Sequence, residues 1–126
     1  MEKLKRIPDT ELEIMQVIWS NPTPISTSQV KAVLEQSRPW KTGALQTLLN
    51  RLIERGYLEA GTEGRNKTYT AIVSEADYLA MESRSVLKRL SSNSITKFVA
   101  SLYDSKAISE EDLQELNSYI DNVRKE

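Results

Sequence analysis

Four polar residues near the middle of the chain have side chains that can hydrogen-bond to the edges of nucleic-acid bases. Gln46, Thr47, Asn50 and Arg51 are spaced i, i+1, i+4 and i+5, so a helix would carry them on one face. In the major groove of DNA, a glutamine can pair bidentately with adenine and an arginine with guanine. The same spacing also fits the solvated side of an amphipathic helix that recognises nothing. The pattern therefore supports a hypothesis of base recognition, with a purely structural alternative beside it.

Residues 41–55 are predicted to form the helix that these side chains require. Leucine and isoleucine recur at helical spacing at positions 45, 48, 49, 52 and 53 and form its apolar face. Gly56 follows at the position where a glycine commonly ends a helix. Lys41 and Thr42, at the start of this helix, are two further candidates for contacts with DNA.

The segments on either side of this helix predict a winged-helix domain over residues 1–73. A first helix is expected over residues 9–19 with Asp9 as its N-cap, and Ser26 with Gln29 has the spacing of a capping box that opens a second. Two strands are expected at 57–60 and 68–72, joined by a polar connection at 61–67. Arg65 and Lys67 in that connection could contact phosphates, which would position the protein without reading sequence. A solvated hairpin tip is the alternative interpretation.

Residues 74–126 are predicted to form a helical dimerisation domain. Three helices are expected, the first opened by Ser74 with Asp77 and the last by Ser109 with Asp112. Their apolar residues exceed what so thin a segment can bury alone, and a second copy of the chain is the simplest partner. A symmetric dimer would also present two recognition helices to a palindromic operator. The alternative is that these helices fold back onto the first domain. The predicted dimerisation residues are Leu87, Leu90, Phe98, Leu102, Leu113, Leu116 and Ile120.

Charge differs between the two predicted domains, although the whole chain carries only −1. Residues 1–73 hold 10 basic and 8 acidic residues, whereas residues 74–126 hold 7 basic and 10 acidic residues. Affinity for phosphates depends on local charge, so the acidic average does not exclude a nucleic-acid partner. A winged-helix module that binds another protein, without sequence-specific DNA binding, remains the alternative function.

The composition argues against an enzyme and against a bound cofactor. The 126 residues include no cysteine and no histidine, which excludes disulfides, thiolate metal sites and histidine general bases. The acidic group at residues 110–112 with Glu115 lies where a helix is expected to start, and acids are stabilised there without a metal. No apolar run is long enough for a membrane span and the first residues do not form a secretory signal, so a cytoplasmic location is expected.

Several stretches together resemble the penicillinase and methicillin-resistance repressors of the BlaI/MecI type, a family that includes copper-responsive CopY-type members. They are residues 11–19, Trp40, residues 47–58, Tyr69, residues 74–78 and residues 108–116. The resemblance implies a homodimeric transcriptional repressor with its winged helix on operator DNA, and it matches Gln46, Thr47 and Arg51 to DNA-contacting positions. It also implies an inducing protease or signal partner, which the sequence does not identify.

The chain departs from the family pattern at three places. The family commonly has Ser-Pro-Lys-Thr after the tryptophan, whereas residues 41–44 here are Lys-Thr-Gly-Ala, so the operator sequence cannot be inherited. The Asn-Phe bond that is cleaved in antibiotic-resistance members corresponds to Ser101-Leu102, which argues against induction by cleavage. The cysteine-rich motif of the copper-responsive members is missing.

Overall fold

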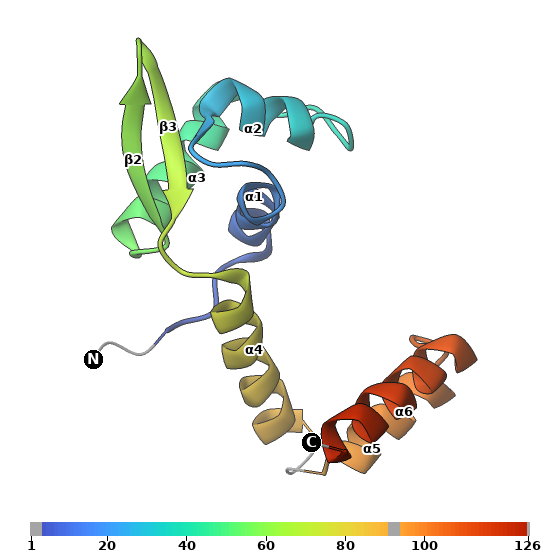
Figure 1. Ribbon diagram of the computed structural model, residues 1–126. Coiled ribbons are helices and arrows are strands. Elements are labelled where there is room, and N and C mark those ends of the chain that lie inside the picture. Colours follow the sequence, from blue (N-terminus) through green and yellow to red (C-terminus); the bar gives the residue numbers. More distant parts are fainter. Residues whose placement is uncertain (1–3, 91–93, 126) are drawn as a thin grey trace. The chain divides into compact units, whose positions relative to one another are not determined.

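The computed structural model describes residues 4–90 and 94–125, which form the predicted winged helix and helical tail (Figure 1). The chain divides into two compact units, residues 1–82 and 83–126. The elements in chain order are α1 (Asp9–Trp19), β1 (Ile25–Ser26), α2 (Thr27–Leu34), α3 (Thr42–Glu54), β2 (Leu58–Glu63), β3 (Asn66–Ala71), α4 (Glu75–Leu90), α5 (Ile95–Asp104) and α6 (Glu110–Arg124).

The sheet contains a short strand, β1, that was not predicted. The three strands lie in the order β1-β3-β2 and both pairs are antiparallel, with Tyr69 of β3 opposite Ile25 on one side and Ala60 on the other. Two residues after a proline give no alternating pattern, so β1 could not be recognised from its sequence.

The hairpin is longer than predicted, and the expected polar connection at residues 61–67 is mostly strand. Thr62 pairs with Lys67, and Glu63 pairs with Asn66. Gly64, at φ +63°, and Arg65 alone form the turn. A glycine adopts this left-handed conformation without steric cost, so a two-residue turn can join the strands. Arg65 and Lys67 therefore lie at the tip of a regular hairpin.

Capping side chains begin α2 and α6 as predicted. Ser26 accepts a hydrogen bond from the Gln29 amide at 3.2 Å and its own amide donates to the Gln29 side chain at 2.9 Å. The same reciprocal pair joins Ser109 and Asp112. The prediction for α1 is wrong: Pro8 is the N-cap, its carbonyl accepts from the Leu12 amide, and Asp9 is the first helical residue.

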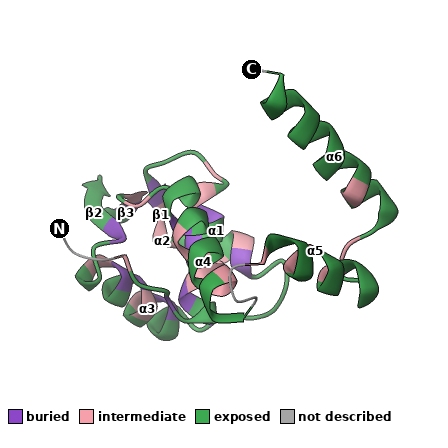
Figure 2. Cartoon of the chain, turned by 90° about the horizontal axis from the view of Figure 1, so that it is seen from below, coloured by how far each residue is buried: buried purple, intermediate pink, exposed green. Residues whose placement is uncertain are grey.

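The hydrophobic core lies within residues 7–78, where one face of each of α1, α2 and α3 packs against the sheet. Met15, Val30, Leu49 and Tyr69 are each 0% exposed. In Figure 2 the buried residues lie on the elements of this first unit. Such complete burial from four different elements gives α3 a rigid base.

Tyr78 joins the start of α4 to this core. Its hydroxyl accepts a hydrogen bond from the Ile7 amide at 3.0 Å and donates one to Glu82 at 2.8 Å. Burial, followed by the hydrogen bond to the Glu82 carboxylate, raises the pKa of Tyr78 to about 12 despite the opposing bond from Ile7. The boundary between the two compact units consequently falls after Glu82. The expected domain boundary at 73/74, placed where the strands give way to helices, remains a prediction.

The second unit has no buried residue among its described residues 83–90 and 94–125. Of the predicted dimerisation residues, Leu90, Leu116 and Ile120 are exposed, at 71%, 38% and 42%. The other four are partly buried, namely Leu87, Phe98, Leu102 and Leu113. Residues 91–93, between α4 and α5, lie outside the described residues, and Ser94 caps α5.

Candidate nucleic-acid interface

The N-terminus of α2, the first turns of α3 and the hairpin tip line one open groove. Four of the predicted DNA-binding residues lie in it, and they come from two elements that are more than ten residues apart in sequence. Its described lining includes three basic residues and no acidic one. The lining residues are Ser26, Thr27, Ser28, Lys31, Thr42, Gln46, Arg65, Asn66 and Lys67.

The exposed face of α3 carries the other predicted contacts. Lys41 is the N-cap residue, and Thr47, Asn50 and Arg51 are exposed along the helix. The Thr47 hydroxyl donates to the Gly43 carbonyl at 3.0 Å, one turn earlier. That bond leaves the Thr47 methyl group and the oxygen lone pairs for any outside partner.

The first turn of α3 carries two small residues, so little side-chain volume projects from it. Gly43 and Ala44 are exposed, and a Cβ added at Gly43 would have no atom within 4 Å. Glycine is therefore not required here by packing within the chain. The open space allows another molecule to approach this turn of the helix closely.

Trp40 anchors the start of α3. Its side chain is 9% exposed and belongs to the core, and its amide donates to Glu35 at 3.3 Å. The Arg38 guanidinium lies over its ring at 4.5 Å. Because its amide and its ring both make these contacts, Trp40 fixes the position of the backbone from which Lys41 and Thr42 project.

Tyr69 connects three elements beneath the groove, although it was not among the predicted site residues. Its hydroxyl accepts a hydrogen bond from Thr27 at 3.2 Å and another from the Gln46 amide nitrogen at 3.1 Å. The same nitrogen donates to the Asn50 carbonyl oxygen at 3.1 Å. A lone aromatic residue in a strand signals core packing, so nothing in the sequence distinguished this hydroxyl. Ser26, Thr27, Ser28 and Lys31 were missed because the prediction considered only α3 and the hairpin.

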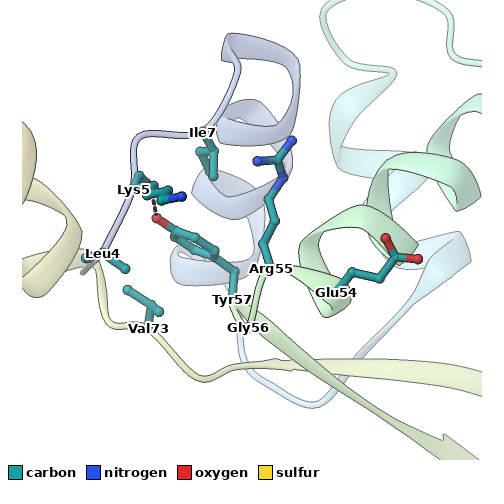
Figure 3. Close-up of a pocket in the computed structure, with 8 residues that line it drawn as sticks. All are labelled: Leu4, Lys5, Ile7, Glu54, Arg55, Gly56, Tyr57 and Val73. Atoms are coloured by element: carbon teal, nitrogen blue, oxygen red, sulfur yellow. Dashed lines mark hydrogen bonds between the residues drawn. The ribbon is translucent and has the colours of Figure 1, made fainter. Parts of the chain in front are cut away.

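A second pocket is formed by residues that contact one another (Figure 3). It is lined by Leu4, Lys5, Ile7, Val73 and residues 54–57. The Tyr57 hydroxyl donates to the Lys5 carbonyl, and burial raises the pKa of Tyr57. Arg55 forms an ion pair with the buried Glu11 at 3.0 Å. These contacts fasten the N-terminal segment and α1 to the end of α3, and they explain the pocket without a ligand.

No membrane-spanning or metal-binding element was found in the described part of the chain. None of its helices has the length and hydropathy needed to cross a bilayer. No group of three or more acidic side chains within residues 4–90 and 94–125 is arranged to hold a metal ion.

Comparison with known proteins gives consistent matches. The model of a family described as Penicillinase repressor matches residues 7–122. A penicillinase repressor of Bacillus licheniformis is 35% identical over 116 residues, which are 92% of this chain and 90% of that protein. The solution structure of the DNA-binding domain of the repressor BlaI is 41% identical, with a TM-score of 0.53, over 62% of this chain and 94% of that domain. The Bacillus licheniformis BlaI monomeric form in complex with the blaP half-operator is also 41% identical, with a TM-score of 0.51, over 62% of this chain and 94% of that one.

Proposed function

This chain belongs to the penicillinase repressor family, and we propose that it represses transcription by binding operator DNA with α3 in the major groove. The observation that carries the proposal is the groove in which Thr42 and Gln46 of α3 meet Arg65 and Lys67 of the hairpin. A relative of 41% identity is described in complex with a half-operator, which supports the same partner here.

The polar residues then divide into two roles. Gln46, Asn50 and Arg51 are of types that read base edges, and Thr47 can place its methyl group against thymine. Lys41, Thr42, Arg65 and Lys67 contact the phosphate backbone and set the position of the helix. The operator sequence is this chain's own, because residues 43 and 44 differ from the common family pattern.

The helical tail makes the functional unit a homodimer. Leu116, Tyr119, Ile120 and Val123 leave an apolar stripe on α6 that is between 38% and 65% exposed. Exposed apolar residues repeated along one helix are typical of an interface. Two copies related by a twofold axis match a palindromic operator with half-sites about ten base pairs apart. An inducing protease or signal partner would complete the switch.

Fluorescence anisotropy with labelled duplex DNA tests the proposal. The full chain is titrated against the DNA upstream of its own gene and against a shuffled duplex, at several salt concentrations. We expect clear preference for the upstream DNA and an affinity that falls steeply with salt. Equal binding to both duplexes would contradict the proposal, and weak, salt-independent binding would favour a protein-interaction module.

Two variants separate the roles of the basic residues. Arg51→Ala should cost about 1–3 kcal/mol and relax the preference at one base pair, whereas Arg65→Ala with Lys67→Ala should weaken all duplexes alike and lower the salt slope by about 2. Lys97→Ala, an exposed lysine of α5, is the matched control and should change neither property.

A further inference from the structure

We infer that Tyr69 is a positioning residue that turns the Gln46 side-chain amide so that its carbonyl oxygen, and not its N–H group, faces the DNA. The inference rests on the proposed function and deepens it, because it predicts which bases one residue of α3 accepts. It begins from the hydrogen bonds beneath the groove, which join α2, α3 and β3.

Tyr69 is a rigid support. It lies in the central strand of the sheet, is paired to Ile25 and Ala60 on either side, and is 0% exposed. A ring packed this closely cannot move, so the Gln46 side chain must adjust to the position of the Tyr69 hydroxyl. Gln46 is partly buried and carries the flexible side chain.

Both hydrogen atoms of the Gln46 side-chain amide are donated in hydrogen bonds within the protein. An amide nitrogen carries two hydrogens. One is donated to the Tyr69 hydroxyl at 3.1 Å and the other to the Asn50 carbonyl oxygen at 3.1 Å. No donor among the described residues bonds to the Gln46 carbonyl oxygen, which therefore remains as the acceptor available to DNA.

This orientation changes what Gln46 can recognise. The usual bidentate pair with adenine needs both the amide N–H group and the carbonyl oxygen. A lone acceptor can bond only to an exocyclic amine, which adenine and cytosine display in the major groove and guanine and thymine do not. Gln46 should consequently discriminate amino bases from keto bases rather than adenine from all others.

Asn50 offers hydrogen-bond donors to the DNA where Gln46 offers an acceptor. Its carbonyl oxygen is occupied by Gln46, and its own amide hydrogens remain for acceptors such as guanine O6 or thymine O4. The pair thus presents an acceptor and a donor one helical turn apart. A single hydrogen bond of ordinary strength would give about threefold to tenfold discrimination at each position.

Tyr69→Phe tests the inference in the full chain, because it removes the hydroxyl and keeps the buried ring. Binding is measured by anisotropy to operator duplexes in which every base pair is changed singly. The position read by Gln46 is the one whose preference disappears in Gln46→Ala. We expect the wild type to favour adenine or cytosine there by about threefold to tenfold. Tyr69→Phe releases one N–H group of the Gln46 amide, which permits the bidentate pair with adenine, so the preference should narrow to adenine.

Tyr57→Phe is the matched control, since it also removes a buried hydroxyl, one that bonds to Lys5. It should leave the base profile unchanged even if it lowers stability. A second readout needs no DNA: the side-chain amide resonances of Gln46 in the free protein should shift in Tyr69→Phe and not in Tyr57→Phe.

Failure of the inference and failure of the proposed function differ. A selective wild type whose profile survives Tyr69→Phe, or which prefers guanine or thymine at the Gln46 position, would overturn the inference alone. A wild type with no base preference at any position would overturn both. A change of the amino-base preference in Tyr69→Phe, with Tyr57→Phe unaffected, supports the inference.

Discussion

The two units of the chain bury their apolar residues to very different extents. Within the first, Leu45, Leu49 and Leu52 of α3 are all 0% exposed. Within the described residues of the second, every leucine, isoleucine and valine is at least partly exposed. The winged helix therefore buries its apolar residues within its own unit, whereas the tail leaves its apolar residues at least partly exposed, and a second copy of the chain is the partner proposed for them.

Truncation of a core side chain should give the largest effect. Leu49→Ala removes a completely buried side chain on α3 and should lower the free energy of unfolding by about 2–5 kcal/mol. Urea unfolding measures the change. Leu79→Ala, at a leucine that is 63% exposed, is the control and should cost far less. Equal losses would contradict the assigned core.

A charge on the tail should affect assembly instead. Leu116→Asp places a carboxylate on the apolar stripe of α6 and should raise the dimer Kd more than about tenfold, because the interface would then bury an unpaired charge. Sedimentation velocity over a range of concentrations reports the change. Ser118→Asp adds the same charge on the opposite side of α6 and should leave the dimer intact. A dimer that survives Leu116→Asp would remove α6 from the proposed interface.

Substitution of Tyr78 should have the smallest effect on stability, and it tests where the first unit ends. Tyr78→Phe should cost about 0.5–1.5 kcal/mol at neutral pH, because hydrogen bonds to Ile7 and Glu82 are lost. The pKa of Tyr78 is raised from 10.0 to about 12, so its contribution to stability is fully present below pH 10 and is lost as the pH rises toward 12.

Urea unfolding of both proteins at several pH values checks this sign. The stability of Tyr78→Phe should fall less steeply than that of the wild type between pH 10 and pH 12. Parallel curves would mean that Tyr78 is not buried in the core and that the first unit ends earlier in the chain.

The sequence predicted the helices and the hairpin better than it predicted where elements begin and which strands pair. Apolar periodicity and capping residues located the six helices of the described residues, and the reciprocal spacing of Ser26 with Gln29 identified a true cap, because these signals are local. The start of α1 was missed because Asp9 is a favourable N-cap type and Pro8 is not. The two-residue strand β1 exists only through its pairing with β3, which no local pattern encodes.

The candidate site shows the same limit. Residue type and spacing were sufficient to propose Gln46, Asn50 and Arg51 on one face of a helix. They could not predict that Tyr69, 23 residues after Gln46, bonds to its side chain, since this contact depends on how β3 packs under α3. Side-chain orientation, and hence the bases accepted, follows from tertiary structure.

The stoichiometry of the DNA complex tests the central claim most directly, because it engages both units at once. The full chain is titrated at a concentration well above Kd into a duplex with the complete palindromic operator and into one with a single half-site, and the mass of each complex is measured by sedimentation equilibrium. We predict two chains on the palindrome and much tighter binding there than on the half-site. One chain per palindrome, with equal affinity for both duplexes, would contradict a winged helix that reads DNA as a tail-linked dimer.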